Sequence, residues 1–333
     1  VTGTGSIEVS GTTDINTTTI TTTGNQTYHG NVTLGVNTVL TAGSAQNISM
    51  ESNLTGGSHT LTISGGNFEL ANALPVVTTL STLIFTGTNA QSFDPGGAEF
   101  ANVTINTTNT VTLTGALSVT GTVTVNGAGT VVDFDTNDTG FSQSTGQNFT
   151  ITNGAVNVGT GKFICGTLSA ASGTSFTQTG INSGTQSAEW ITGDGTINWD
   201  NGNAGGTLLI GACDAGAVNF HHKHVTINKT PITLSGTFYD LTVPDAYTLN
   251  LGNNLTVSRN LTNNGSIVIA DYELQFLNYL EDADSTVSIE DGIITSTKAA
   301  GPAQNLSRVT FTSGSIATLN GNTGGLTIAS PAY

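Results

Sequence analysis

The chain has 333 residues, among them 62 Thr, 43 Gly and 33 Asn, and only 8% of it is charged, with a formal net charge of −16. Ordinary globular proteins carry roughly 25% charged residues, so this composition argues against a cytoplasmic enzyme, and abundant β-branched residues with only 6 Pro argue against disorder. Because Thr, Asn and Gly are weak helix formers, the composition predicts an all-β protein, and we expect it to be secreted.

Short runs in which apolar and hydroxyl residues alternate recur along the chain, for example at 111–114, 117–125, 255–258 and 326–328. Alternation with a period of two places one set of side chains inside and the other outside, which predicts β-strands. Asn-Gly, Gly-Gly and Gly-Asn steps between the runs are typical of turns. The segment closest to a helical composition, 273–284, is interpreted as strand and loop.

The alternating runs belong to an internal repeat, in which apolar-Thr-apolar, a short turn and apolar-x-apolar are usually followed by Gly. In chain order, copies begin at residues 31, 102, 224, 240 and 308, and weaker copies at 60 and 148. The segments 100–127 and 238–265 align without a gap, so that Phe100 matches Phe238. A unit of this size cannot bury its own apolar face and needs neighbours on which to stack.

Stacked units of strand, corner and strand predict a parallel β-helix (β-solenoid) with roughly 20–25 residues per coil. Tandem β-sandwiches are the alternative, because they also consist of short strands with frequent turns. Acidic and aromatic residues concentrate after about residue 266. We therefore expect a repetitive β-solenoid over 1–265 and a continuation, or a capping and assembly β region, over 266–333.

Residues 21–35 and 100–127 resemble segments of large secreted bacterial proteins of the filamentous-haemagglutinin-like, β-helical adhesin type. The resemblance implies a right-handed β-helix at a cell surface that serves adhesion or assembly, and it carries no catalytic residues. The secretion domain typical of those adhesins is not evident, which leaves the export route open. Because the chain begins with Val1 rather than Met, we expect that a signal segment was removed or trimmed.

The balance of charges limits the partners of the protein. With 6 Lys and Arg against 22 Asp and Glu, the chain cannot supply the phosphate contacts of nucleic-acid binding, nor dock on an anionic membrane. Its longest apolar stretches, such as 74–77 and 267–270, are far shorter than the roughly 20 residues that cross a bilayer. We expect neither a nucleic-acid partner nor a membrane span.

An acidic turn near residue 135 is a candidate metal site. Asp133, Asp135 and Asp138 lie close together, and Thr136 and Asn137 add oxygen atoms between them. Clusters of hard oxygen ligands suit Ca²⁺, but the spacing is neither that of an EF-hand nor that of calcium-binding solenoids. Calcium is thus the one candidate cofactor, and the alternative to a calcium site is a turn that is solvated and binds no ion. The same two interpretations apply to a second acidic group, formed by Glu281, Asp282, Asp284, Glu290 and Asp291.

Histidines and cysteines form no familiar site. His221, His222 and His224 are the densest imidazole cluster, but no second ligand pair at the spacing of a zinc site accompanies them, so we interpret them as a solvated polar edge. Cys165 and Cys213 either form one disulfide, as is common in secreted proteins, or are two separate buried thiols.

Polysaccharide-cleaving β-helix enzymes use paired carboxylates. The candidate pairs are Asp133 with Asp135 and Asp194 with Asp200. The 6 Lys and Arg residues are scattered, which leaves little to neutralise an acidic sugar. Trp190 and Trp199 form either a sugar-stacking platform or a packed corner, and we favour packing. We therefore do not expect an enzyme.

Asn-x-Ser/Thr sequons are frequent, and they carry glycans only where the host has the machinery. The candidate glycosylation sites are Asn16, Asn25, Asn31, Asn47, Asn53, Asn102, Asn106, Asn137, Asn148, Asn228, Asn254, Asn260, Asn264 and Asn305.

Together these features predict an extracellular structural protein at the cell surface, which forms a filament, sheath or surface coat by self-assembly and can act as an adhesin. Because open solenoid ends expose strand edges, the expected partners are copies of the chain itself, joined end to end or by strand donation, and surface glycans. The alternatives are a polysaccharide-binding or polysaccharide-cleaving β-helix protein and a viral or phage fibre.

Overall fold

The computed structural model describes residues 1–71, 75–134, 136–137, 139–179, 185–199, 207–211, 213, 217–220, 225–227, 231–281, 284–289, 292–298, 304–306, 309–311, 318–321 and 326–328. All regular secondary structure in these ranges is β-strand, with no helix. The chain divides into two compact units, Val1–Gly180 (unit 1) and Ile181–Tyr333 (unit 2), and each is described by itself.

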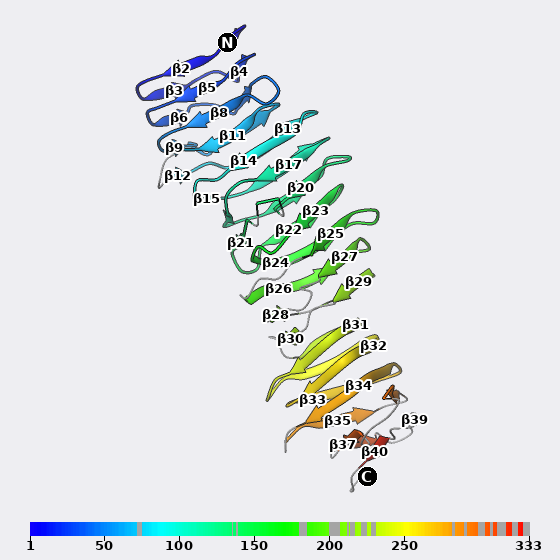
Figure 1. Ribbon diagram of the computed structural model, residues 1–333. Helices are drawn as coiled ribbons and strands as arrows, with labels where there is room; N and C mark the ends of the chain where they lie inside the picture. The colour runs from blue at the N-terminus through cyan, green and yellow to red at the C-terminus, as the bar shows by residue number, and fades with distance from the viewer. Residues whose placement is uncertain are drawn as a thin grey trace. The chain divides into compact units, whose positions relative to one another are not determined.

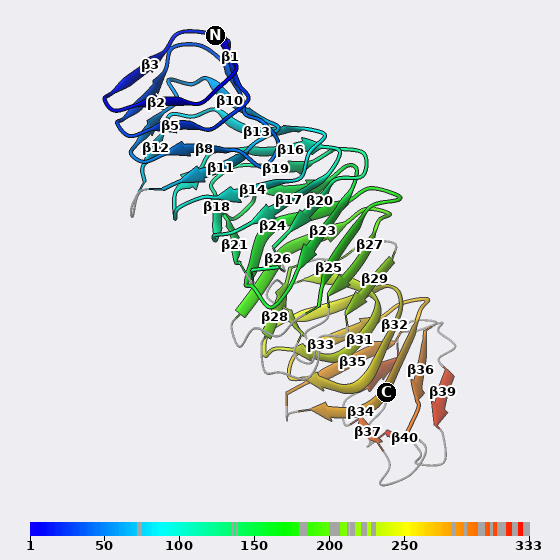
Figure 2. The ribbon, with the colours of Figure 1, turned by 45° about the horizontal axis from the view of Figure 1, so that its top comes forward.

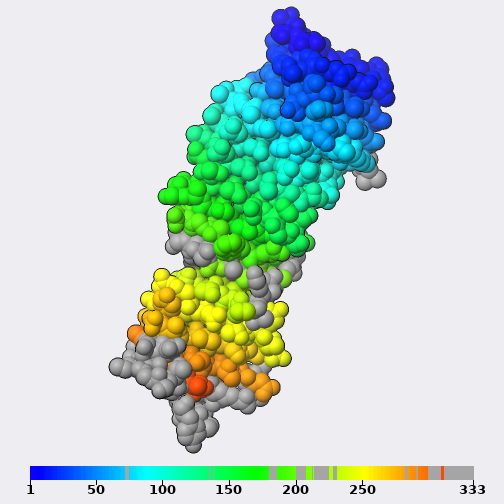
Figure 3. Space-filling view, turned by 180° about the vertical axis from the view of Figure 1, so that it is seen from behind, coloured from blue at the N-terminus to red at the C-terminus, as the bar shows by residue number. Residues whose placement is uncertain are grey.

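Unit 1 is a stack of coils made of short parallel strands (Figures 1 and 2). Its strands are β1 (Thr2–Gly3), β2 (Ile7–Val9), β3 (Thr13–Ile15), β4 (Thr19–Thr22), β5 (Gln26–Tyr28), β6 (Val32–Leu34), β7 (Thr38–Thr41), β8 (Asn47–Met50), β9 (Leu54–Thr55), β10 (Thr60–Ser64), β11 (Asn67–Leu70), β12 (Val77–Thr78), β13 (Thr82–Gly87), β14 (Gln91–Asp94), β15 (Glu99–Phe100), β16 (Val103–Thr107), β17 (Thr110–Leu113), β18 (Leu117–Val119), β19 (Val123–Val125), β20 (Val131–Asp133), β21 (Phe141–Gln143), β22 (Asn148–Ile151), β23 (Ala155–Val158), β24 (Phe163–Ala170) and β25 (Ser175–Gln178). In the space-filling view, successive segments of this unit follow one another as bands in chain order (Figure 3).

Strand pairing gives the length of each coil. In the first coil Thr2 pairs with Thr21, which is 19 positions further on. The longest described step in unit 1 is 26 positions, from Val123 to Phe149. Every described pairing joins a strand to its equivalent in the next coil in parallel, as in a β-solenoid. The prediction of a parallel β-helix is therefore confirmed, and tandem β-sandwiches, which consist of antiparallel sheets, are excluded.

The interior of unit 1 is filled by the side chains that alternate inward along each strand. Strands such as Val103–Thr107 and Val123–Val125 show the expected alternation of buried and half-buried positions. Aromatic rings occupy much of this interior, with neighbouring centroids 4.8–6.4 Å apart, the range of favourable ring contacts. They form two clusters, Phe68, Phe85, Phe93 and Phe100, and Phe134, Phe141, Phe149, Phe163 and Phe176.

Asparagines at the corners link successive coils. The Oδ1 atom of Asn25 accepts the backbone N–H of Asn47 (3.0 Å), and the Oδ1 atom of Asn47 accepts the side-chain N–H of Asn67 (3.1 Å). The Oδ1 atom of Asn67 in turn accepts the backbone N–H of Ser92 (2.9 Å). Where the ladder stops at a corner, these amides supply the acceptor that a buried or half-buried N–H requires.

Unit 2 is also built of parallel coils (Figure 1). Its strands are β26 (Thr185–Thr192), β27 (Thr196–Trp199), β28 (Thr207–Ile210), β29 (Ala217–Phe220), β30 (Val225–Ile227), β31 (Ile232–Val243), β32 (Thr248–Asn263), β33 (Ser266–Ile269), β34 (Glu273–Glu281), β35 (Thr286–Ile289), β36 (Ile293–Ser296), β37 (Gln304–Leu306), β38 (Val309–Phe311), β39 (Thr318–Gly321) and β40 (Leu326–Ile328).

The long strands β31 and β32 pair over most of their length, with register shifts that mark bulges at the corners. β32 then pairs with β33 and β34. The ladder therefore continues past residue 265, where the change in composition begins, and 273–281 is a strand, as predicted.

Candidate functional site

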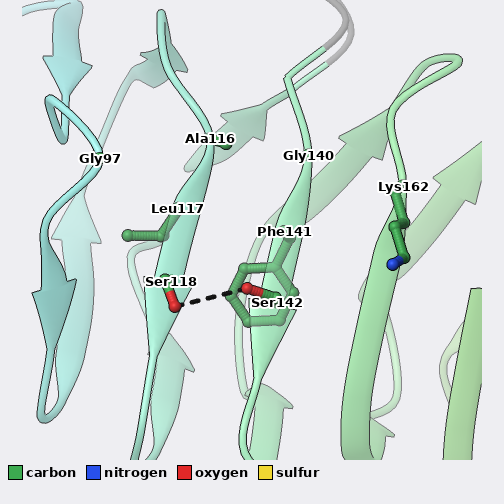
Figure 4. Close-up of a pocket in the computed structure, with 8 residues that line it drawn as sticks. All are labelled: Gly97, Ala116, Leu117, Ser118, Gly140, Phe141, Ser142 and Lys162. Atoms are coloured by element: carbon green, nitrogen blue, oxygen red, sulfur yellow. Dashed lines mark hydrogen bonds between the residues drawn. The ribbon is translucent and has the colours of Figure 1, made fainter.

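A shallow hollow of about 420 Å³ lies on the outer surface of unit 1, along β15, β18, β21 and β24 (Figure 4). Its lining residues are Gly97, Ala116, Leu117, Ser118, Gly140, Phe141, Ser142 and Lys162. The register of these strands places Gly97, Ala116, Gly140 and Lys162 at the same corner of four successive coils. Because three of these four residues are Gly or Ala, the surface is recessed at this corner.

The backbone holds this corner in a fixed arrangement. The N–H of Leu117 donates to the carbonyl of Gly140 (2.9 Å), and the N–H of Phe141 donates to that of Lys162 (2.7 Å). The side chains of Leu117 and Phe141 are buried in the core. The hydroxyls of Ser118 and Ser142 therefore stand on the outer face of adjacent strands, 3.4 Å apart.

The lining of the hollow offers two hydroxyl groups, those of Ser118 and Ser142, and the exposed side chain of Lys162. These groups can bind hydroxyl-rich or anionic groups of an extended ligand.

The acidic turn predicted as a calcium site is only partly described. Asp133 ends β20, and its carboxylate accepts the backbone N–H of Thr136 (3.1 Å) and the hydroxyl of Thr136 (2.6 Å). Asp135 and Asp138 lie outside the described residues. Within the ranges that the structure covers, no group of three or more His, Cys, Asp or Glu side chains could hold a metal ion. The carboxylate of Asp133 closes its own turn, and calcium binding at this turn stays a prediction.

The second acidic group is only partly described, and the histidine cluster lies outside the described residues. Asp282, Glu290 and Asp291 lie outside the described ranges, as do His221, His222 and His224. Asp200 is also outside them, so the pair of Asp194 and Asp200 is not tested, and Asp194 is exposed.

The two cysteines and the two tryptophans are placed individually. Cys165 in β24 of unit 1 and Cys213 in unit 2 are both buried, and a disulfide between them stays one of the two predicted alternatives. Trp199 is completely buried, and its Nε1–H donates to Oε1 of Gln186 (2.7 Å). Trp190 is 45% exposed. Because Trp199 cannot reach a ligand, the two rings do not form a shared stacking platform.

The sequon asparagines differ in exposure. The exposed ones are Asn16, Asn25, Asn31, Asn106, Asn137, Asn148 and Asn254, and the half-buried ones are Asn47, Asn53, Asn102, Asn260 and Asn264. Asn228 and the side chain of Asn305 lie outside the described residues. The Nδ2 atom, to which a glycan would attach, already donates to a neighbour in three of them: Asn102, Asn137 and Asn260.

Two charged clusters were not foreseen from the sequence. In unit 1, His29 contacts Glu8 and Glu51, and in unit 2, Arg259 is paired with Asp240. The partners of each cluster are about one coil apart in the sequence, so only the coil length brings them together. A search for charged residues separated by one coil would have found both.

Within the described residues, no helix is long and apolar enough to cross a membrane. Comparison of the chain with protein-family models, curated proteins and solved structures found no match.

Proposed function

We propose that the protein is an extracellular structural protein whose solenoid units assemble with further copies of the chain into a filament, sheath or surface coat. The observation that carries this proposal is the parallel ladder in each unit. Each coil pairs with the coil before it and offers the same backbone groups to the coil after it. The mechanism is passive: hydrogen-bonded coils and a packed interior resist unfolding. Nonspecific ionic contacts are limited because the chain has only 6 Lys and Arg residues.

The first coil shows how a further copy can pair. The backbone N–H of Thr13 donates to the carbonyl of Asn31, and the carbonyl of Ile15 accepts the backbone N–H of Gly35. Thr13 and Ile15 are therefore both bonded to the second coil. In a parallel ladder, alternate residues direct their N–H and C=O groups to opposite sides. The backbone groups of Asp14 therefore point away from the second coil, which is the direction from which another strand pairs.

Assembly can be tested by blocking this edge. Asp14→Pro removes the outward N–H. No bond to the second coil is lost, because the backbone groups of Asp14 point away from that coil, and proline is tolerated at a strand edge. We expect concentration-dependent polymers of the wild type in sedimentation and negative-stain microscopy, and smaller species for Asp14→Pro. Asp14→Asn keeps the N–H and is the matched control. A wild type that is monomeric at all concentrations would contradict the proposal, and a closed trimer would favour a viral or phage fibre.

Glycan binding is a second candidate function, favoured by the hollow around Ser118, Ser142 and Lys162. An extended saccharide lying across the coils would meet hydroxyl groups along the hollow and one ammonium group at its end. A screen of neutral and acidic glycans against the wild type and Lys162→Gln tests it, with Lys298→Gln as the control for loss of charge. Loss of binding to acidic glycans only in Lys162→Gln would support this function. Cleavage of a glycan, abolished by Asp194→Ala, would instead show that the protein is an enzyme.

A further inference from the structure

His29 lies between two carboxylates that come from the coils on either side of it. It directly follows β5, which pairs with β2 of the first coil and β8 of the third. Its Nε2 atom is 3.0 Å from Oε1 of Glu8, and its Nδ1 atom is 2.6 Å from Oε2 of Glu51. One imidazole ring therefore connects three successive coils through side chains, in addition to the backbone ladder.

The geometry fits the protonated ring. A neutral imidazole has one N–H donor and one acceptor nitrogen, whereas the imidazolium ion has two donors. Since carboxylate oxygens only accept, both contacts of His29 can be hydrogen bonds only when both ring nitrogens carry protons. Loss of one proton would place a nitrogen lone pair against a carboxylate at hydrogen-bond distance, and it would leave Glu8 and Glu51 as uncompensated like charges.

We propose that Glu8, His29 and Glu51 form a pH-dependent clamp that ties the first coil of unit 1 to the second and third coils. Beside the clamp, the inward residues Ile7 and Val9 of the first coil are half-buried. This inference does not depend on the proposed function, since it concerns contacts within one chain.

The electrostatic surroundings indicate the direction of the pH dependence. Hydrogen bonds from the imidazole ring to Glu51 and then to Glu8 raise the pKa of His29 above its ordinary value of 6.5, while desolvation acts in the opposite direction. Among the described residues, these are the charged groups that face the ring: β2 contributes Glu8, β8 is followed by Glu51, and the next coil carries Ala71 at this position. Because the pKa is raised in the folded state, the stabilisation is complete below the unfolded pKa of about 6.5 and is lost as the pH rises through the folded value.

Hydrogen exchange on the full chain tests the clamp. After correction for intrinsic exchange rates, we expect the protection of peptides within 1–30 to fall about two- to fivefold between about pH 5.5 and pH 8.5. Peptides within 100–125 of the same unit should not change. His29→Gln should abolish the dependence, because glutamine does not titrate. His59→Gln, which removes the other imidazole of unit 1, is the matched control and should behave as the wild type.

A titration of the ring itself gives an independent measurement. The chain has 5 His, so NMR of histidine-labelled protein can follow His29, assigned by its loss in His29→Gln. We expect its midpoint to lie above 6.5 and to fall toward that value in the double variant Glu8→Gln, Glu51→Gln. An unchanged midpoint in the double variant, or unchanged pH-dependent protection in His29→Gln, would overturn the proposal.

Discussion

Two segments that align without a gap, 100–127 in unit 1 and 238–265 in unit 2, occupy equivalent positions in their solenoids. In both, the first apolar-Thr-apolar run pairs in parallel with the run one coil later, and the inward positions of these runs match. The equivalent pairs are Val103–Val123 with Thr104–Thr124 in unit 1, and Leu241–Leu261 with Thr242–Thr262 in unit 2. The alternation of apolar and hydroxyl residues is thus sufficient to specify the same register twice in one chain.

The turn after the second strand is also the same in the two segments. In unit 1 the N–H of Asn126 donates to the carbonyl of Ile105 (2.9 Å), and in unit 2 the N–H of Asn264 donates to that of Val243 (2.8 Å). A glycine follows in each segment, where the backbone passes close to a carbonyl of the preceding coil.

The corner before the second strand differs between the segments. In unit 1, the Oδ1 atom of Asn102 accepts the N–H of Thr122 (2.9 Å), and the corner is completed by Ala101 and Gly121. A side chain on Gly121 would overlap the carbonyl of Ala101 and the amide of Asn102. This corner is therefore compact and carries no charge.

In unit 2 the same corner carries a charged and aromatic cluster. Asp240 takes the place of Asn102 and still accepts the equivalent N–H, that of Asn260 (3.1 Å). Arg259 stands where unit 1 has Gly121, pairs with the Asp240 carboxylate through two nitrogens, and lies 4.9 Å from the ring centroid of Tyr239. The Asp240 carboxylate raises the pKa of Arg259 above its usual value. The corner requires an acceptor for the backbone N–H, and its outer residues can vary.

The largest expected effect comes from giving unit 1 the buried amide of unit 2. Val125 is completely buried between Ile105 and Ile151, whereas its counterpart Asn263 has hydrogen-bond partners. Val125→Asn would lose apolar burial and leave an amide without partners, so we expect unit 1 to be destabilised by about 4 kcal/mol. Protection of peptides within 100–127 should fall, and that of 238–265 should not. Val125→Ala should cost clearly less, and equal effects of the two variants would contradict this explanation.

The shared glycine is expected to be required in both units. A Cβ atom on Gly127 would overlap the carbonyl of Thr107, and one on Gly265 would overlap the carbonyls of Pro244 and Tyr247. Gly127→Ala and Gly265→Ala should each destabilise their own unit by about 3 kcal/mol, because the backbone must move. Gly11→Ala, at a position with open space around it, is the control. Local hydrogen exchange measures all three, and a neutral effect of either first variant would break the equivalence of the two turns.

The converse change in unit 2 should cost somewhat less. Asn263 donates to the hydroxyl of Tyr279 (2.9 Å) and the carbonyl of Thr286 (3.1 Å), and it accepts the N–H of Gly265 (3.2 Å). Asn263→Val would match unit 1 but remove these bonds, and we expect a loss of about 2 kcal/mol, partly offset by the apolar side chain. Adding Tyr279→Phe should cost less in this background than in the wild type. Strict additivity of the two changes would show that the bond to Tyr279 contributes nothing.

Much of the fold was accessible from the sequence because solenoid strands are specified locally. Alternation of apolar and hydroxyl residues predicted the strands, and the internal repeat predicted a parallel β-solenoid. The structure confirms both. Buried polar positions could not be predicted. Gln26 and Gln91, for example, occupy inward positions, where their Nε2 atoms donate to carbonyls of neighbouring coils. Nothing in their local sequence distinguishes them from outward-facing residues.

The candidate hollow was inaccessible for a related reason. It exists because Gly97, Ala116 and Gly140 fall at one corner, yet the steps between them are 19 and 24 residues. Such irregular steps hide a column of small residues from any search at a fixed period. The same irregularity separates His29 from Glu8 and from Glu51 by different numbers of residues, 21 and 22.

The smallest expected effect is at the corner cluster of unit 2. Asp240→Asn would make this corner resemble Asn102 of unit 1: the acceptor for the N–H of Asn260 remains, and only the ion pair with Arg259 is lost. Because the Arg259 side chain is 33% exposed, solvent screens the pair, and we expect a loss of about 1 kcal/mol or less. Asp240→Ala also removes the acceptor and should cost about 1–3 kcal/mol. Protection of peptides within 238–265 measures both. If the two variants were equally destabilised, the ion pair rather than the backbone acceptor would hold this corner, and the two units would differ in what stabilises them.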